Sequence, residues 1–113
     1  MAKAHKHTKI KDPTLDLIVK NLTSSMKLKS LYLFGSRARG DHDSDSDYDL
    51  VAVIGNSKQS KLERSAKART AIGRVGAAVD IIVLTEREFE QSSREYGGLV
   101  EIIESEGQEI DIG

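Results

Sequence analysis

The chain has 113 residues, of which 38% are hydrophobic and 31% charged, and its formal net charge at pH 7 is −1. These values indicate one soluble globular domain over residues 1–113, with about the first ten residues as a mobile basic tail. No run of about 20 apolar residues could span a bilayer and no signal peptide is present, so we expect a cytoplasmic protein. The absence of cysteine excludes disulfides, thiolate zinc sites and cysteine nucleophiles.

The first predicted element is a helix of about four turns. Asp12 and Pro13 suit a helix start, and the apolar residues that follow recur at helical spacing: Leu15, Ile18, Val19 and Leu22. A short apolar run at 30–34 predicts a buried strand that ends at Gly35, and residues 36–40 can form one helical turn.

The remaining elements alternate between strand and helix patterns. Apolar runs predict strands at 48–54, 77–84 and 108–112, whereas 58–75, 85–91 and 99–106 have helical patterns. Thr85 stands three residues before Glu88, as in a capping box. The order of elements predicts an α+β fold, an α/β sandwich in which helices pack against a mixed sheet of about four strands.

Two aspartates, Asp47 and Asp49, stand at the start of the strand predicted at 48–54. Alternate residues of a strand share a face, so both carboxylates lie on one side with their Cα atoms about 6.6 Å apart. Without a counter-ion their repulsion costs on the order of 2 kcal/mol at an effective dielectric constant of about 20. Oxygen ligands favour Mg²⁺, Mn²⁺ or Ca²⁺, and Mg²⁺ typically completes its shell with waters and substrate phosphates. The pair therefore indicates a phosphate-bearing substrate.

A third carboxylate, Asp80, interrupts a strand otherwise made of Ala, Val, Ile and Leu. An unpaired charge is rare at such a position. If this strand pairs with the one at 48–54, the three acids form the cage expected for two metal ions about 4 Å apart. Taken alone, Asp80 is equally compatible with a strand-edge acid or a salt-bridge partner.

Gly35 and Ser36 follow the first predicted strand. Glycine lets the backbone approach a ligand closely, and Ser36 would open a helical turn whose free N–H groups favour anions. Because Gly-Ser after a strand is also an ordinary turn, this pair indicates a phosphate site only together with the aspartates.

The spacing Gly35-Ser36, ten residues, Asp47-Tyr48-Asp49 and then Asp80 resembles the DNA polymerase β-like nucleotidyltransferase superfamily. The run 34–54 is similar to its minimal nucleotidyltransferase branch, and the likeness extends over about residues 15–112. The resemblance implies two Mg²⁺ ions, ATP or another nucleoside triphosphate as substrate, and catalytic and metal-binding roles for the residues Asp47, Asp49 and Asp80. It also implies nucleotide-binding roles for the residues Gly35, Ser36 and Arg39.

The resemblance implies a partner as well. Many minimal nucleotidyltransferases look like partners of helical HEPN proteins, and the transferase of such a pair acts as an antitoxin that adenylylates a tyrosine of the toxin. We expect such a HEPN-type partner here, since 113 residues leave no second domain to bind an acceptor. Two alternatives stay open: an antitoxin of the same fold that acts by complex formation without catalysis, and a transferase acting on a small hydroxylated molecule.

Other motifs fit the acidic segment less well. An EF-hand loop counted from Asp41 requires Gly at its sixth position and Glu at its twelfth, where this chain has Ser46 and Ala52. A P-loop requires Lys followed by Ser or Thr after Gly40, where Asp41 and His42 stand instead.

Basic residues gather in two places. The first 29 residues contain seven lysines and two aspartates, but no aromatic residues interleave with them, so nucleic acid is not an expected partner. A second set recurs every third residue in the helix predicted at 58–75: Lys58, Lys61, Arg64 and Lys67. We interpret this set as a solvated helix face, with contact to a triphosphate or an acidic partner as the alternative.

Overall fold

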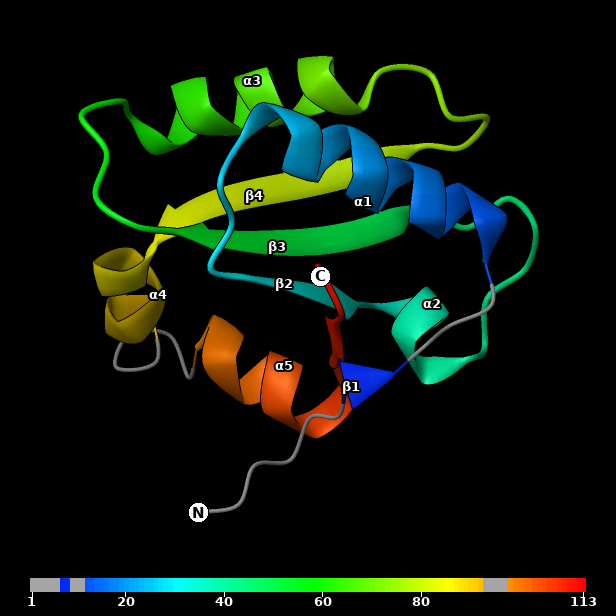
Figure 1. Ribbon diagram of the computed structural model, residues 1–113. Helices are drawn as coiled ribbons and strands as arrows, with labels where there is room; N and C mark the ends of the chain where they lie inside the picture. The colour runs from blue at the N-terminus through cyan, green and yellow to red at the C-terminus, as the bar shows by residue number, and fades with distance from the viewer. Residues whose placement is uncertain (1–6, 9–11, 93–97) are drawn as a thin grey trace.

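The computed structural model of the chain describes residues 7–8, 12–92 and 98–113, which contain one five-stranded sheet and five helices (Figure 1). The strands are β1 (His7–Thr8), β2 (Ser30–Phe34), β3 (Tyr48–Ile54), β4 (Val79–Thr85) and β5 (Gln108–Ile110). The helices are α1 (Pro13–Ser25), α2 (Ser36–Arg39), α3 (Lys61–Ile72), α4 (Glu86–Ser92) and α5 (Leu99–Glu106). No helix among these is long and apolar enough to cross a membrane.

The sheet is mixed, with strand order β1-β5-β2-β3-β4. β4 runs parallel to β3 and β1 runs parallel to β5, whereas β2 is antiparallel to both of its neighbours. This arrangement confirms the predicted α+β class with helices against a mixed sheet. It also places β4 beside β3, as is required for Asp80 to lie near Asp47 and Asp49.

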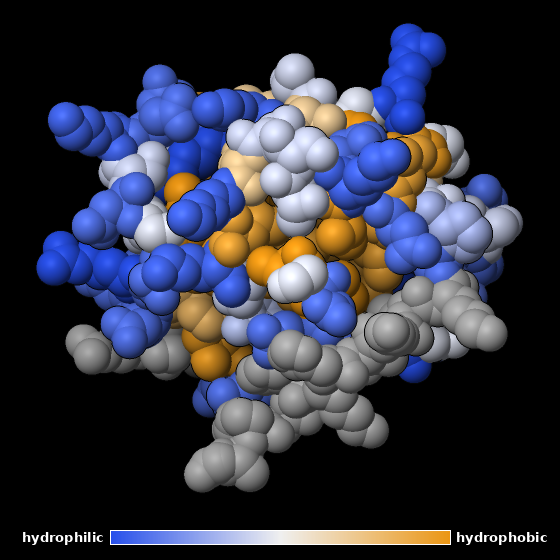
Figure 2. Space-filling view, in the orientation of Figure 1, coloured by the Kyte–Doolittle hydropathy of each residue, from blue (hydrophilic) through white to orange (hydrophobic). Residues whose placement is uncertain are grey.

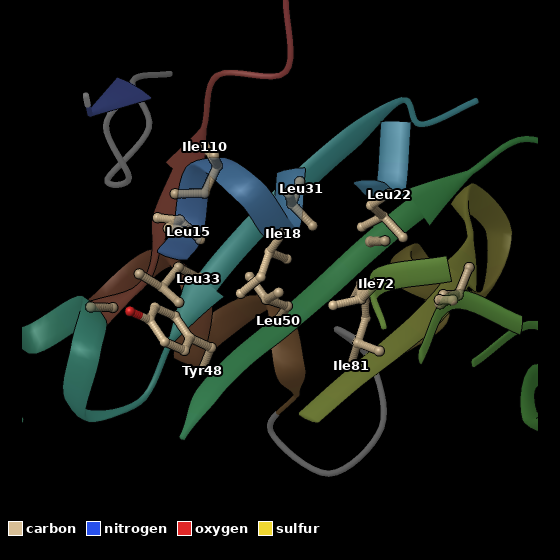
Figure 3. Close-up of a cluster of buried hydrophobic side chains, with 14 residues drawn as sticks. Leu15, Ile18, Leu22, Leu31, Leu33, Tyr48, Leu50, Ile72, Ile81 and Ile110 are labelled. Atoms are coloured by element: carbon tan, nitrogen blue, oxygen red, sulfur yellow. The ribbon is translucent and has the colours of Figure 1, made fainter. Parts of the chain in front are cut away.

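Helices cover both faces of the sheet (Figure 1). On one face α1 and α3 pack on the cluster that Figure 3 shows, which includes Ile18 and Ile72 from the helices and Leu50 from β3. On the other face α4 and α5 pack on a smaller cluster that includes Val51 and Ile103. In the space-filling view, hydrophobic residues gather near the centre of the visible face, and hydrophilic side chains surround them (Figure 2).

Side-chain caps explain where α1, α3 and α4 begin. Asp12 is the N-cap of α1, and its carboxylate accepts a hydrogen bond from the Leu15 amide at 3.1 Å. The predicted capping box of Thr85 and Glu88 is present at α4, with both reciprocal hydrogen bonds formed. Ser60 caps α3 in the same way, so this helix begins at Lys61 and not at 58 as predicted.

Two features differ from the sequence-based expectations. His7–Thr8 pair with β5 as a short strand, within the segment predicted to be a mobile tail; the neighbouring positions 1–6 and 9–11 lie outside the described residues. The second difference is Arg64, which was predicted to lie on a solvated helix face but is 3% exposed. Its guanidinium donates hydrogen bonds to Val83 O, Gln59 O and Glu88 Oε1, which ties α3 to β4 and α4.

We expect Arg64→Ala to lower the free energy of unfolding by about 2 to 3 kcal/mol, because it removes the buried guanidinium that donates to two carbonyls and to the Glu88 carboxylate. Lys67→Ala is the matched control, since Lys67 is an exposed residue of the same helix, and its effect should stay within about 0.5 kcal/mol. Urea unfolding of the three proteins measures both values. Equal stability of the two variants would contradict the structural role of Arg64.

Candidate functional site

One part of the sheet is open to solvent on the face that carries α4 and α5. Asp80 and Ile82 of β4 lie on this face, because they alternate with Val79 and Ile81, which belong to the cluster beneath α1 and α3. Ile82 is 36% exposed, and Asp80 is exposed as well. The described part of α4 and α5 therefore leaves the first half of β4 accessible to a ligand.

Asp49 and Asp80 lie side by side at this open face. They are register partners in the parallel ladder of β3 and β4, so their side chains leave the sheet on the same side. Strands in such a ladder are about 4.8 Å apart. Asp47 precedes β3 by one residue and is exposed. The structure thus brings together the three carboxylates that the sequence analysis singled out.

The electrostatics of Asp49 reflect this proximity. Burial raises the pKa of the half-buried Asp49 carboxyl, the charges of Asp80 and Asp47 raise it further, and the charge of Arg39 acts in the opposite direction. None of the three aspartates has a hydrogen-bond or ion-pair partner in the described part of the chain. Three carboxylates that repel one another are a costly arrangement, which a bound divalent cation would relieve.

The carboxylates would form only part of a metal shell. Among the described residues, no group of three or more His, Cys, Asp or Glu side chains is arranged to hold a metal ion by itself. The three-carboxylate cage expected from the sequence is therefore not formed by the described side chains alone. Mg²⁺ is usually bound by one or two carboxylates and takes waters and substrate phosphates as its other ligands. The donor set is therefore compatible with a cation that arrives together with a phosphate-bearing substrate.

Gly35 forms the wall of the site next to Asp49. It follows Phe34, the register partner of Asp49 in β2, and has φ 75° and ψ −161°, a conformation essentially restricted to glycine. A Cβ at this position would lie 3.3 Å from Cγ of Asp49 and would collide with its Oδ2. Glycine is thus required here both by the backbone conformation and by the close approach to the carboxylate.

Ser36 and Arg39 lie at the two ends of the four-residue helix α2. The Ser36 hydroxyl has no hydrogen-bond partner among the described residues. The exposed Arg39 guanidinium makes ion pairs with Asp41 at 3.1 Å and Glu106 at 2.9 Å, and these hydrogen bonds raise its pKa. Arg39 is therefore engaged with acids beside the site and not with the three aspartates directly.

The sequence analysis missed Arg37, which lies between Ser36 and Ala38 on the same helix. Its guanidinium contacts the loop that leads to Asp47 and lies 4.0 Å from the centre of the Tyr48 ring. The sequence does place this arginine a few residues before an acidic loop, which could have suggested a contact between them. Its hydrogen-bond partners are backbone carbonyls, however, and no sequence pattern reveals such partners.

A cavity of about 490 Å³ lies elsewhere, at the opposite end of β3. It is lined by residues from the end of α1, the end of β3 and the start of α3, including Met26, Ile54 and Lys67. The aspartates stand at the beginning of β3, so this cavity is separate from the candidate site, which is an open surface.

Comparisons with known proteins find a matching family model and similar solved structures. The model of the nucleotidyltransferase domain family matches residues 14–110. A solved structure from Sulfolobus solfataricus, assigned as a nucleotidyltransferase, is 34% identical with a TM-score of 0.55, over 69% of each chain. A chain of a toxin-antitoxin structure solved with AMP-PNP is 23% identical with a TM-score of 0.54, over 83% of this chain and 69% of that one, and at this identity shares the fold alone. The search of curated proteins finds no match.

The close approach of Gly35 to Asp49 can be tested with Gly35→Ala. Gly73 provides a matched control, because it has nearly the same backbone conformation, φ 67° and ψ −154°, but its Cβ would meet only Thr70 O at 3.9 Å. Both substitutions should lower the free energy of unfolding by about 1 to 3 kcal/mol through backbone strain. Only Gly35→Ala should also displace Asp49 and weaken Mn²⁺ binding, measured by electron paramagnetic resonance of free Mn²⁺ in the presence of a nucleotide analogue. Equal Mn²⁺ binding by the two variants would refute the contact.

Proposed function

Since this chain belongs to the nucleotidyltransferase domain family, we propose that it transfers AMP, or another nucleoside monophosphate, from a nucleoside triphosphate to a hydroxyl group with the help of Mg²⁺. The observation that carries the proposal is the in-register pair Asp49 and Asp80 on the open face of the sheet, with Asp47 beside it. The absence of any protein counter-charge bonded to these carboxylates, within the described residues, supports a role for them as metal ligands.

In the proposed reaction, the acceptor oxygen forms a bond to the α-phosphorus, and the bond from that phosphorus to the bridging oxygen breaks to release pyrophosphate. When bound at such a site, two Mg²⁺ ions would lower the pKa of the attacking hydroxyl and neutralise charge on the pyrophosphate. Asp47 and Asp49 would hold the ions. Asp80 would serve as a further ligand or as the base that accepts the proton of the hydroxyl.

The start of α2 supplies the proposed phosphate contacts. The amides of Ala38 and Arg39 donate hydrogen bonds to Gly35 O, so the amides of Ser36 and Arg37 and the Ser36 hydroxyl remain available for phosphate oxygens. Arg39 lies one turn further, and its ion pairs are exposed, so they contribute little and a triphosphate can compete for the guanidinium.

The proposed acceptor is a tyrosine of a helical HEPN-type toxin, with this chain as the antitoxin. No described segment covers Asp80 and Ile82 or forms a pocket over them for a second substrate, so a docked protein can bring its hydroxyl directly to the aspartates. Orienting that hydroxyl is worth on the order of 7 to 11 kcal/mol in a well-arranged site, which isolated encounters with free alcohols do not provide. The toxin-antitoxin structure with bound AMP-PNP, which shares this fold, supports the choice of partner class.

Two other functions would use the same fold. A pure binding antitoxin would form the complex without needing the aspartates, and a transferase for small hydroxylated molecules would need no partner protein. The pure binding function leaves the mutual repulsion of the carboxylates without a role. The small-molecule function leaves the open surface over Asp80 and Ile82 without a pocket for its substrate.

We expect Asp49→Asn to reduce AMP transfer by more than about a hundredfold, because it removes a metal ligand and its charge. Asp16→Asn, on α1 across the sheet, is the matched control and should retain wild-type activity. The assay incubates the protein, its co-purifying partner, Mg²⁺ and ATP labelled at the α-phosphate, and locates the added AMP by mass spectrometry.

Each alternative gives a different result in this assay. A stable complex without any AMP on the partner would favour the pure binding function. Rapid labelling of free small alcohols with no modified protein would favour a small-molecule acceptor. Near-normal transfer by Asp49→Asn would contradict the metal-binding role itself.

A further inference from the structure

The position of Asp47 depends on its neighbours. Asp47 is exposed, precedes the first residue of β3 and has no hydrogen-bond or ion-pair partner of its own within the described residues. The loop before it, residues 41–46, consists of polar and acidic residues, and a local turn between Asp43 and Ser46 is its main internal structure. Whatever fixes Asp47 must therefore act on the residues immediately before and after it.

Arg37 holds the residue before Asp47. Its Nε donates a hydrogen bond to Ser46 O at 2.9 Å, and its Nη2 contacts the carbonyls of Asp43 and Ser44 at 3.4 Å each. The Arg37 side chain is only 10% exposed. Its hydrogen bond to Ser46 O is partly buried, whereas its contacts with Asp43 O and Ser44 O are exposed. One planar guanidinium thus binds three carbonyls of the loop that leads into β3.

Arg37 also contacts the residue after Asp47. Its guanidinium lies over the Tyr48 ring, 4.0 Å from the ring centre, and this ring packs into the core beneath α1, close to Leu33 (Figure 3). The Tyr48 hydroxyl donates a hydrogen bond to Asp12 Oδ2 at 2.7 Å, and Arg37 Nη1 lies 3.9 Å from the same oxygen. The N-cap of α1, Arg37 and the start of β3 form one connected network.

The charges of this network are balanced within it. Burial opposes ionisation of Asp12, but the hydrogen bonds from Tyr48, Leu15 and Thr14 together with the charge of Arg37 lower its pKa, so Asp12 is ionised at neutral pH. Each of the three guanidinium nitrogens of Arg37 faces an oxygen of the protein. Arg37 is therefore engaged by the loop and by the N-cap of α1.

We propose that Arg37 is a positioning residue for the metal site: it fixes Ser46 and Tyr48, and thereby holds Asp47 where a divalent cation shared with Asp49 requires it. This inference rests on the proposed function. It depends on the planar fork of the guanidinium, because a lysine would keep the positive charge but could not contact three carbonyls and a ring at once. Residues that orient metal ligands typically change metal affinity about 10- to 100-fold when they are substituted.

The test measures Mn²⁺ binding by electron paramagnetic resonance in the presence of α,β-methylene-ATP, which has no transferable α-phosphate. The variants are Arg37→Lys and Arg37→Ala, and Asp49→Asn, which removes a proposed metal ligand, serves as the reference for lost binding. Arg69→Ala is the matched control, since Arg69 is exposed on α3 and its side chain has no partner in the described part of the chain. Circular dichroism and thermal unfolding show that each variant is folded at the temperature of the titration, and if Arg37→Ala does not fold, Arg37→Lys alone decides.

We expect Arg37→Lys to bind Mn²⁺ about tenfold more weakly than the wild type, Asp49→Asn to lose binding, and Arg69→Ala to be unchanged. A folded Arg37→Lys variant with wild-type Mn²⁺ affinity overturns the positioning role, while loss of binding in Asp49→Asn in the same experiment leaves the proposed function standing. If the wild type itself binds no Mn²⁺ with the analogue, the proposed function fails and this inference fails with it.

Discussion

The parallel pairing of β3 with β4 sets Asp49 directly beside Asp80, and the proposed chemistry depends on this register. A shift by one residue would turn the side chain of Asp80 to the opposite face, among the residues beneath α1 and α3. The register is fixed by the apolar residues that alternate with the acids, since Tyr48 and Leu50 on β3 and Ile81 on β4 must all reach that core. The same hydrophobic packing that holds the sheet together therefore places the carboxylates.

The residues around Asp49 and Asp80 are also placed by the packing of the sheet and its helices. α4 and α5 cover the far part of the sheet face, so the acids stay accessible at its open part. Gly35 closes one side without a Cβ that would displace Asp49, and Arg37 fixes the loop that brings Asp47 to the pair. Burial is the largest cause that raises the pKa of Asp49, and repulsion from Asp80 and Asp47 raises it further. Under the proposed function, a bound cation would relieve this repulsion.

The sequence was sufficient for those features that depend on local pattern. Alternation places Asp47 and Asp49 on one face, helix caps at Asp12 and Thr85 fix two helix starts, and the apolar runs give four of the five strands. Features that depend on contacts between distant segments were out of reach. Spacing alone could not show that β4 lies beside β3, that Arg64 is buried against Val83 O, or that Arg37 binds the carbonyls of the loop. The pairing of His7–Thr8 with β5 was missed for the same reason, since two residues form no periodic pattern.

The central claim is that Asp47, Asp49 and Asp80 share divalent cations with a nucleoside triphosphate. A crystal grown with Mn²⁺ and a non-hydrolysable triphosphate, measured at the manganese absorption edge, tests it most directly. We expect anomalous density between the three carboxylates and the triphosphate, with the phosphates against Gly35 and Ser36. Triphosphate bound at another surface, or anomalous density that touches none of the three aspartates, would contradict metal binding by these residues.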